Sequence, residues 1–509
     1  MGPDRAAEGK GGDRLNGAMP DLRQLCRAAL ARQSELPAIE FERRWYDWGE
    51  LARVATSLQS ALASTDAPES APVILVARNH PAFIAALLAL LAQGRTVRMV
   101  YAFQSAAGIA REIDALQACA AVARKQDLAE PVRQAIRRKG MMGIALDDMA
   151  VELLDPPANA WAGAVPAMSS IEILTSGTTG PPKRFQVSYE LLERHFITTP
   201  LTATQGANPG SIPPFLVSFP LGNITGLYIT LPTILSGQRI ILLERFRLGA
   251  WLDYVKRYRP AHSGLPPSCV QELLDANVCR EDLASLKALG VGAAPLDPTV
   301  QRTFEEAYGI PILISYGATE FAGPVTAVSP EDHARHGRDK IGTVGRALPG
   351  VRLRVVDPES GQDLGANADG VLQVVSPRIG PEWIRTSDLA RIDRDGFLFI
   401  LGRADGAINR GGFKVLPESV ERALTLHPDI SEAAVTGIPD RRLGAVPVAA
   451  IRLRPGAGKP SIEALEQHLR EQVAAPSIPV KWLFCDDLPR TPSHKTDRRA
   501  LQELFEKSD

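Results

Sequence analysis

Residues 174–184 hold a dense set of anion-binding groups. They read Leu-Thr-Ser-Gly-Thr-Thr-Gly-Pro-Pro-Lys-Arg. Glycines allow the backbone to turn its N–H groups toward an anion, hydroxyl groups add short donors, and a lysine supplies a point charge. The stretch therefore predicts a polyphosphate-binding loop. Its expected members are Thr175, Ser176, Gly177, Thr178, Thr179, Gly180 and Lys183.

The composition of this loop leaves a second interpretation open, because clusters of Gly, Ser and Thr also form ordinary turns. The loop is not a Walker A motif, since two residues rather than four separate Gly177 from Gly180 and two prolines precede Lys183. A P-loop nucleoside triphosphatase is therefore disfavoured. We expect a strand at 171–174 before the loop, and residues 186–188 leading into a helical pattern at 189–196 after it.

A second group of chemistry-bearing residues ends the apolar, β-branched segment 311–320, Pro-Ile-Leu-Ile-Ser-Tyr-Gly-Ala-Thr-Glu. Chemistry in parallel-sheet proteins gathers at the carboxyl ends of strands, so the position suits a site. Tyr316 can stack on a base, Thr319 can bind a phosphate, and Glu320 can hold a hard cation that bridges phosphates. The alternative is a structural strand end in which Thr319 caps a helix.

Two turns that follow apolar segments are further candidates. The turn at 221–226 contains Asn223, which either lines a site or fills the turn, because Asn tolerates left-handed backbone. The segment 288–296 predicts a strand followed by a Gly/Ala turn, where a flat ring can approach the backbone closely.

Two kinds of sheet are expected to position these residues. Strands at 73–77, 96–100 and 120–123 alternate with helices at 48–63, 81–92 and 108–118, which predicts parallel βαβ units. Antiparallel strands are expected at 351–356, 370–375, 388–393 and 397–402. Residues 414–509 predict a small α+β module, with helices at 417–426 and 461–474 and strands at 433–437, 446–453 and 480–484. A chain of 509 residues also calls for two or more domains.

Composition excludes several classes of protein. Hydrophobic residues make up 45% of the chain and charged residues 23%, as in ordinary globular proteins. Lys and Arg number 57 against 58 Asp and Glu, so the net charge is −1 and binding to nucleic acid is unsupported. The five cysteines form no Cys-x-x-Cys pair, which argues against a zinc site or a disulfide framework and indicates reduced thiols in a cytoplasmic protein.

The sequence predicts neither a secretory signal peptide nor a transmembrane segment. Residues 1–18 lack an apolar core, so we expect a disordered leader, with Met19 as a possible alternative start. The apolar helix at 81–92 is shorter than the ~20 residues that a bilayer span needs, so it predicts a buried helix and no transmembrane segment.

Five motifs, taken together and in order, resemble the adenylate-forming superfamily of acyl-CoA synthetases, peptide-synthetase adenylation domains and firefly luciferase. They are the loop 174–183, the strand end 316–320, Thr386-Ser-Asp388, Gly402-Arg-Ala-Asp405 with Gly412-Phe-Lys-Val415, and Pro489-Arg-Thr-Pro-Ser-His-Lys495. The resemblance runs from about residue 30 to 500. It implies an α/β fold with mixed parallel βαβ sheets and a distorted β-barrel subdomain in a large N-terminal domain (19–404), followed by a small mobile α+β domain (405–509).

The resemblance also implies a reaction and the residues that perform it. A carboxylate attacks the α-phosphate of ATP to give an acyl-adenylate and pyrophosphate, and a thiol then displaces AMP; ATP, Mg²⁺ and coenzyme A are the implied cofactors and co-substrate. The catalytic residues would be Lys495, Thr319 and Glu320, with Glu320 also holding Mg²⁺. The nucleotide would contact Ala293, Ala294, Pro295, Tyr316, Gly317, Asp388 and Arg403. Asp405 would be the hinge, and Gly411, Gly412 and Phe413 would border the CoA channel.

Some positions depart from the family pattern. Asn223 stands where a His or an aromatic residue usually gates the acid pocket, and His494 replaces the glycine before the C-terminal lysine. Asn409 stands where lysine is common, and Ser387 replaces a usual glycine. A Pro-Leu-Asn-Pro-like turn is absent around residues 100–103. None of these changes removes an expected phosphate, ribose or catalytic residue, so an active enzyme with atypical substrate recognition is expected.

The leading interpretation is a carboxylic acid–CoA ligase, a monomer or homodimer. Rivals are a stand-alone adenylation enzyme that loads a carrier protein and a non-catalytic nucleotide- or acyl-binding homologue. Residues 222–225 offer no carboxylate for an α-amino group, so an aryl or short to medium acyl acid without one is favoured. The expected pocket wall is Asn223, Ile224, Ser263, Gly264 and Gly292.

Overall fold

The computed structural model describes residues 21–158, 161–175, 183–197, 212–403, 406–410, 413–440, 443–491 and 495–507. Several expected features lie outside these residues. They are the leader at 1–18, the loop residues Ser176, Gly177, Thr178, Thr179 and Gly180, the hinge Asp405, the channel glycines Gly411 and Gly412, and His494. Of Thr175, Lys183, Asn409 and Phe413, only the backbone is described.

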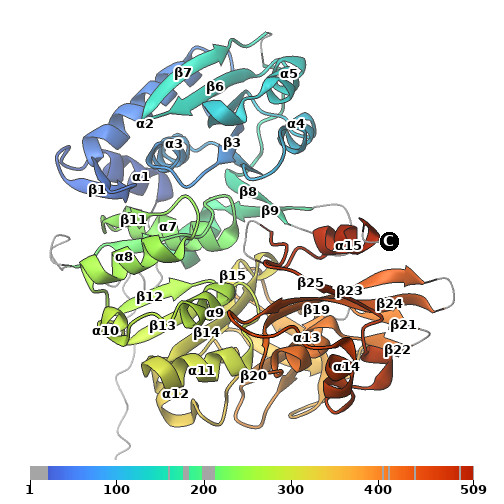
Figure 1. The fold of residues 1–509 in the computed structure, drawn as a ribbon. Coiled ribbons are helices and arrows are strands. Elements are labelled where there is room, and N and C mark those ends of the chain that lie inside the picture. Colours follow the sequence, from blue (N-terminus) through green and yellow to red (C-terminus); the bar gives the residue numbers. More distant parts are fainter. Residues whose placement is uncertain are drawn as a thin grey trace, which may run out of the picture.

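A seven-stranded sheet forms the first lobe, at the top of Figure 1. Its order is β7 (Ala150–Asp155), β6 (Met142–Asp147), β5 (Ala120–Arg124), β3 (Val73–Ala77), β4 (Val97–Tyr101), β8 (Ser170–Thr175) and β9 (Lys183–Ser188). The five central strands are parallel, and only the two edge pairs are antiparallel. The expected βαβ units are therefore confirmed.

Helices cover both faces of this sheet because alternate residues of β3 point in opposite directions. Val73 and Leu75 join one core with α1 (Leu22–Leu30), α2 (Trp48–Ala63) and α3 (Pro81–Ala92). Ile74 and Val76 join a separate core with α4 (Ala106–Asp114) and α5 (Glu130–Arg138). Every residue of α3 is buried, as its continuous apolar sequence predicts, and none of the described helices has both the length and the apolar character for a membrane span.

Two further sheets lie below the first lobe (Figure 1). One has the order β10 (Phe215–Val217), β11 (Ile240–Leu242), β1 (Pro37–Phe41) and β2 (Arg44–Asp47). The other has the order β12 (His262–Leu265), β13 (Ala288–Val291), β14 (Ile312–Ala318), β15 (Gly323–Ala327) and β16 (Arg346–Ala347). The helices of this region are α7 (Ile224–Leu235), α8 (Leu248–Tyr258), α9 (Pro267–Asp275), α10 (Arg280–Leu283), α11 (Pro298–Tyr308) and α12 (Pro330–His336).

The expected antiparallel sheet consists of β17 (Arg352–Val356), β18 (Asp369–Val375), β19 (Ile384–Ile392) and β20 (Leu398–Arg403). It continues beyond β20 through hydrogen bonds of Leu398 with Val344 and Gly345, which lead into β16. Its inner face packs on β14 and β15 around Phe321 and Val325. Through these hydrogen bonds the antiparallel sheet continues into the neighbouring five-stranded sheet.

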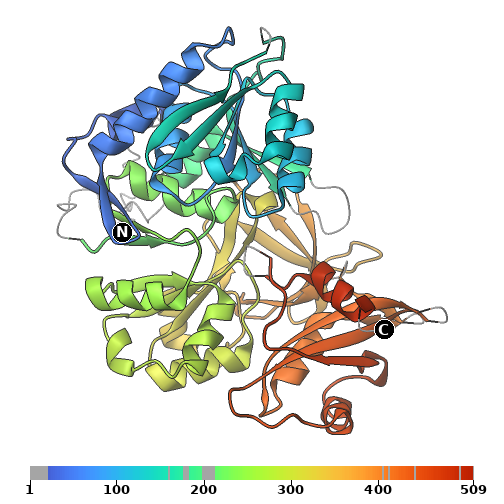
Figure 2. The same ribbon diagram turned by 45° about the horizontal axis from the view of Figure 1, so that its top comes forward.

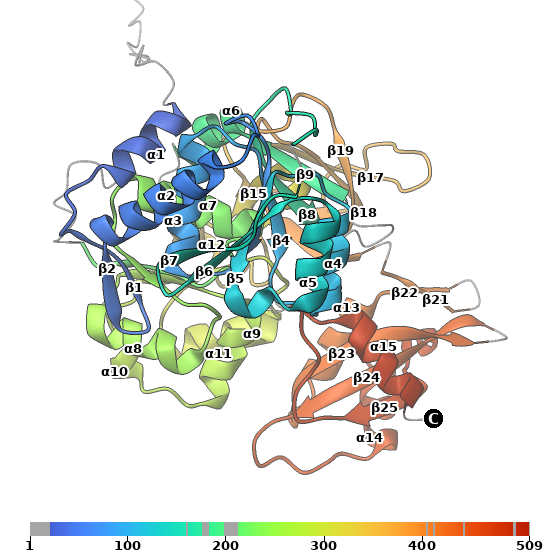
Figure 3. The ribbon, with the colours of Figure 1, turned by 90° about the horizontal axis from the view of Figure 1, so that it is seen from above.

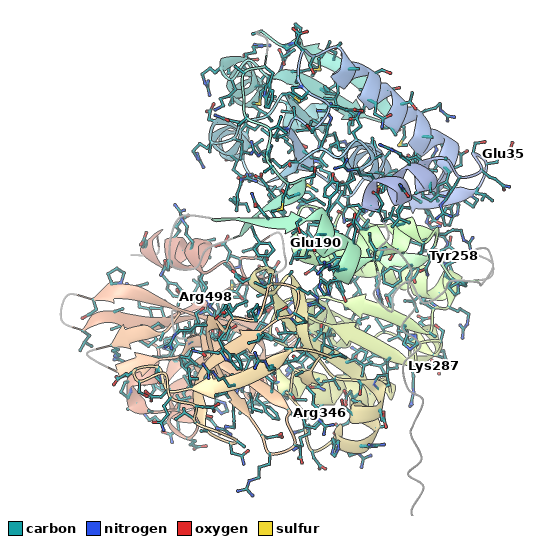
Figure 4. The ribbon with its side chains drawn as sticks, turned by 180° about the vertical axis from the view of Figure 1, so that it is seen from behind. Glu35, Glu190, Tyr258, Lys287, Arg346 and Arg498 are labelled. Atoms are coloured by element: carbon teal, nitrogen blue, oxygen red, sulfur yellow. The ribbon has the colours of Figure 1, made fainter. Side chains whose placement is uncertain are left out.

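Residues 406–507 form a C-terminal module to one side of the larger part (Figures 2 and 3). Its sheet holds β21 (Ile408–Arg410), β22 (Phe413–Val415), β23 (Ile430–Asp440), β24 (Gly444–Leu453) and β25 (Lys481–Phe484), with helices α13 (Pro417–Thr425), α14 (Ile462–Arg470) and α15 (Arg498–Lys507). Arg498, labelled in Figure 4, ties α15 to the module through Glu418 at 2.8 Å and the Val435 carbonyl at 2.6 Å.

One buried carboxamide joins the first lobe to the second sheet. Asn79 follows β3 and is 1% exposed. Its Nδ2 donates to the carbonyls of Phe219 and Leu243, each at 3.0 Å, and its Oδ1 accepts from the Leu221 N–H at 2.8 Å. The backbone turn that leads to Asn223 is therefore held from the end of β3.

We expect Asn79→Ala to lower the free energy of unfolding by about 3 kcal/mol, because three backbone groups lose their buried partner. Calorimetry of thermal unfolding would measure the change. Gln134→Ala is the matched control, since it also removes a carboxamide but on an exposed helix face, with an effect below about 0.5 kcal/mol. Equal melting temperatures of the two variants would contradict this role for Asn79.

Candidate active site

The strand β14 ends in the middle of the site. It runs parallel to β13 on one side and antiparallel to β15 on the other. Gly317 lies so close to β15 that a Cβ on it would stand 2.4 Å from the Gly323 carbonyl oxygen, so no larger residue fits without a backbone shift. The chain then turns into the short helix η4 (Thr319–Phe321). Thr319 is the first residue of η4, and Ala318, not Thr319, occupies its N-cap.

Two polar side chains at this strand end have no partner within the described part of the chain. Glu320 is exposed, and no hydrogen bond or ion pair of its carboxylate is found there. The same holds for the Thr319 hydroxyl, since only its backbone carbonyl is used, by the Ala322 N–H. Both groups are therefore available to a ligand.

A polar network on the antiparallel sheet faces this strand end. Asp388 on β19 and Arg403 on β20 are directly paired across the ladder. The Tyr316 hydroxyl donates to Asp388 Oδ2, and Arg403 donates to the Ser387 hydroxyl. Burial and then the adjacent Asp388 carboxylate raise the pKa of Tyr316, so its hydroxyl stays protonated and continues to donate. Three residues expected at the nucleotide thus lie together.

Lys495 reaches the same place from the C-terminal module. Its loop is closed by two hydrogen bonds between Thr491 and Lys495, at 2.7 and 3.2 Å. Desolvation and then the nearby Arg403 lower the pKa of the Lys495 ammonium, while Asp388 and Glu320 act in the opposite direction. Its ammonium makes no hydrogen bond or ion pair with any described residue. A cation and a carboxylate therefore face one shared space.

Strained backbone borders the site on two sides. Ala293, after β13, and Ala322, after η4, have φ values of 69° and 55°, in the left-handed region that costs a residue with a Cβ about 1 kcal/mol or more. Ala293 is exposed, Ala294 is half-buried and Pro295 is exposed, so the turn offers its backbone to a ligand. This matches the expected close approach of a flat ring.

Two of the residues expected to line the acid pocket also make structural hydrogen bonds. Asn223 is the N-cap of α7, and its Oδ1 accepts from the Gly226 N–H at 2.7 Å, so it holds the turn, although its backbone is extended (φ −121°) and not left-handed as expected. No described residue is a partner of its Nδ2. Ile224 is 7% exposed. The Ser263 hydroxyl accepts from Trp251 Nε1 at 3.0 Å, which commits it to the buried indole.

The two glycines expected in the pocket wall lie on neighbouring strands. Gly264 on β12 is paired with Gly290 on β13, and a Cβ at Gly264 would meet only the Gly290 carbonyl, at 3.7 Å. Gly292 lies beside Ser315, whose hydroxyl would stand 2.7 Å from a Cβ there. Ser315 was not among the candidate site residues, although its position on the predicted strand next to Tyr316 pointed to this site.

The stretch predicted to bind phosphate is flanked by two antiparallel strands. Thr175 at the end of β8 is paired with Lys183 at the start of β9. The expectation of a strand before the loop is confirmed. After the loop, the structure contains a strand that the sequence did not predict, β9 (Lys183–Ser188). The predicted helical pattern follows it as the short helices α6 (Tyr189–Leu191) and η2 (Leu192–Phe196). The alternation of β9 was obscured by its basic first residues.

A divalent cation would fit here only with help from a ligand. No group of three or more His, Cys, Asp or Glu side chains in the described residues could hold a metal ion by itself. At this strand end Glu320 offers a carboxylate that has no partner among the described residues. Mg²⁺ is commonly held by one or two carboxylates together with substrate phosphates, so this donor set fits a Mg²⁺ that arrives with a polyphosphate.

The chain is similar to known protein families and solved structures. Residues 26–382 match the family described as AMP-binding enzyme, and residues 419–495 match the AMP-binding enzyme C-terminal domain. A 4-coumarate–CoA ligase-like protein 8 of Arabidopsis thaliana is 31% identical over 350 residues, covering 65% of this chain and 62% of that relative. The chain thus spans less than two thirds of that relative.

Two other proteins extend the comparison. A 2-succinylbenzoate–CoA ligase of Bacillus subtilis is 30% identical over 348 residues, covering 65% of this chain and 68% of the relative. ATP-bound MatB from Rhodopseudomonas palustris is 23% identical, has a TM-score of 0.77, and covers 96% of this chain and 100% of its own, which shows a shared fold. Because the first family model alone covers residues 26–382, the chain belongs to the AMP-binding enzymes, the adenylate-forming superfamily.

Proposed function

We propose that this protein is an ATP-dependent carboxylic acid–CoA ligase. In the first step a carboxylate oxygen attacks the α-phosphorus of ATP, the bond to the β-phosphate breaks, and acyl-AMP and pyrophosphate result. In the second step the thiol sulfur of coenzyme A attacks the acyl carbon, its proton passes to solvent, and AMP leaves. Alignment and charge neutralisation contribute more to such phosphoryl chemistry than covalent catalysis does.

The carrying observation is the meeting of Lys495, Glu320 and Thr319, none of which has a side-chain partner among the described residues. A free ammonium, a free carboxylate and a free hydroxyl at one strand end suit an anionic ligand that brings its own counter-ion. Lys495 would bridge the attacking carboxylate and the α-phosphate, where negative charge builds up. Thr319 would donate to the α-phosphate.

The nucleotide would lie between the strand-end turns and the antiparallel sheet. Asp388 would accept the ribose hydroxyls with Arg403 beside it, and the Tyr316 hydroxyl fixes the orientation of Asp388. The turn 293–295 and Gly317 would flank the adenine, whose edge can approach a backbone without side chains. The loop from Thr175 to Lys183 would hold the outer phosphates. Mg²⁺, held by Glu320 and those phosphates, would supply charge neutralisation at the leaving pyrophosphate.

The second step requires a new arrangement of the C-terminal module. We place the boundary at Asp405, with residues 19–404 and 405–509 as the two domains. Polar contacts between them include Arg452 with Asp275 at 3.3 Å and Thr425 with Asp297 at 2.9 Å. Such contacts can be exchanged at low cost. Rotation would remove Lys495 and bring Gly411, Gly412 and Phe413 to the thiol.

The acid is expected to lack an α-amino group. The turn that holds Asn223 contains no carboxylate, so a buried ammonium would stay unpaired. The names of the relatives, 4-coumarate and 2-succinylbenzoate ligases, favour an aryl acid for this chain as well. Gly264, where a Cβ would meet only the Gly290 carbonyl at 3.7 Å, would leave room for a flat group.

A pyrophosphate-release screen over carboxylic acids, with and without coenzyme A, tests the proposal. Acid-dependent release of pyrophosphate together with thioester formation would support it. Adenylate that accumulates without transfer to coenzyme A would point to a carrier protein as acceptor. Release with no acid at all would contradict the ligase reaction.

We expect Lys495→Ala to lower acid-dependent pyrophosphate release by about 10²-fold or more, because the group that neutralises charge in the first step is lost. Thioester formation from supplied acyl-adenylate should change by less than about threefold. Lys287→Ala, at an exposed lysine labelled in Figure 4, is the control. An equal loss in both half-reactions would refute the assigned role.

Asn223→Asp keeps a good N-cap, so the melting temperature should hold, while the KM for the acid rises about tenfold through charge repulsion. Steady-state kinetics with the preferred acid would measure this. Ser461→Ala, which removes the N-cap of α14, controls for lost stability and should leave the KM unchanged. An unaltered KM for Asn223→Asp across the acid panel would exclude Asn223 from the pocket.

A further inference from the structure

Arg378 is a desolvated cation without a carboxylate partner among the described residues. It lies in the turn after β18, which Ser376 fixes by donating to the Phe321 carbonyl at 3.1 Å. One guanidinium nitrogen, Nη1, donates to the Pro324 carbonyl at 2.5 Å. No acidic group contributes to its electrostatics, and burial lowers its pKa. Four of its five N–H donors have no described acceptor.

The basic residues near this guanidinium leave its charge uncompensated, because His195 is held neutral and Arg194 is paired with Glu190. His195 lies close enough that Arg378 lowers its pKa, after the effect of burial. Arg194 acts on His195 in the same direction, although it also pairs with Glu190 at 2.6 Å. Glu190, labelled in Figure 4, lies in α6, which leads directly into η2 with Arg194 and His195. A half-buried cation without an acidic neighbour is costly unless an anion joins it.

A tyrosine presents a second donor at the same point. The Tyr228 ring centroid lies 5.9 Å from the Arg378 guanidinium carbon and 5.3 Å from the Phe196 ring. Burial raises the pKa of the Tyr228 hydroxyl, which therefore stays protonated, and no described residue accepts from it. Both side chains flank Gly323: a Cβ there would stand 3.6 Å from Arg378 Nη1 and 3.6 Å from Tyr228 Cδ2.

These donors connect directly to the two ends of the candidate acid site. Gly323 is paired with Ala318, the residue before Thr319. Tyr228 lies on α7, five residues after its N-cap Asn223, a distance of about 7–8 Å along the helix. Thr225, Tyr228 and Ile229 are half-buried on one helix face, whereas Ile224, Gly226 and Leu227 are buried. That face leads from Asn223 toward Arg378.

Resting on the proposed ligase function, we propose that Arg378 and the Tyr228 hydroxyl bind a second carboxylate at the far end of the acid, so that the preferred substrates are dicarboxylic acids. One carboxylate reacts beside Thr319 and Lys495, and the other is neutralised by Arg378. The missing side chain at Gly323 leaves space beside Arg378 Nη1 and the Tyr228 ring, where the second carboxylate would enter. A substrate ammonium in this position would be repelled.

Pairs of acids with matched length test the proposal: adipate against hexanoate, suberate against octanoate, and terephthalate against 4-methylbenzoate. Pyrophosphate release gives kcat/KM for each acid. We expect the wild-type protein to favour the dicarboxylate by about tenfold or more in at least one pair. Arg378→Met should abolish that preference while it changes kcat/KM for the monocarboxylate by less than about threefold.

The control variants separate recognition from folding. Arg352→Met makes the same chemical change at an exposed arginine that also donates to a proline carbonyl, at 3.4 Å, and should leave the preference intact. Arg378→Lys should retain part of the preference, and Tyr228→Phe should weaken only the dicarboxylates. Should Arg378→Met not fold, Tyr228→Phe and Arg378→Lys carry the same test.

Two failures remain distinguishable. A wild-type protein that turns over only monocarboxylates, or an Arg378→Met variant that loses both members of a pair equally, overturns the role of Arg378 and leaves the ligase reaction standing. Absence of acid-dependent pyrophosphate release with every acid overturns the ligase reaction itself.

Discussion

The hydrogen bonds of Asn79 hold together the parts from which the site is built. A single carboxamide after β3 satisfies two backbone groups in the turn after β10 and one directly after β11. Buried peptide groups in such turns need partners, and a side chain that supplies three of them fixes the turn in one position. These hydrogen bonds therefore also position the N-cap of α7 and the face of α7 that leads to Arg378.

The site itself depends on how closely β14 and β15 approach each other. Gly317 permits a backbone contact that excludes any side chain, and Ala322 accepts a left-handed conformation so that the chain can reverse at once. This tight reversal exposes Thr319 and Glu320 and buries Phe321 in the core below them. The strain at Ala322 and Ala293 is therefore a local cost of presenting backbone and polar groups to a ligand.

The sequence predicted best those elements whose residues decide their own structure. The apolar helix α3 and the strand β3 were placed with correct ends, because a continuous apolar run between turn residues leaves few alternatives. β9 was missed as a strand, since Lys183 and Arg184 hide its alternation and only pairing with β8 reveals it. The helix α15 was missed for a related reason: its charged surface is held by Arg498, whose partners are distant in sequence.

Some residues of the candidate site can be identified from the sequence, and others only from the structure. Thr319, Glu320 and Asp388 stand at strand ends or in recognisable motifs, so residue type and position were enough to find them. Arg378 gave no such signal, because an arginine in a turn is usually solvated, and only its neighbours show that it is desolvated without an acid. Ser387 is a similar case. The sequence shows that it departs from the family pattern, but only the pairing of β19 with β20 reveals its contact with Arg403.

A common electrostatic principle links the site residues. Arg378 has no described acidic partner, and Lys495 and Glu320 make no ion pair with a described residue, whereas the buried Arg78 is paired with Asp127 at 2.6 Å. Unpaired charges near apolar surroundings reduce stability, and they persist where a ligand supplies the missing charge. A dianionic acid together with ATP and a divalent cation would match all three at once: the cation would meet Glu320, the reacting carboxylate and α-phosphate would meet Lys495, and the distal carboxylate would meet Arg378.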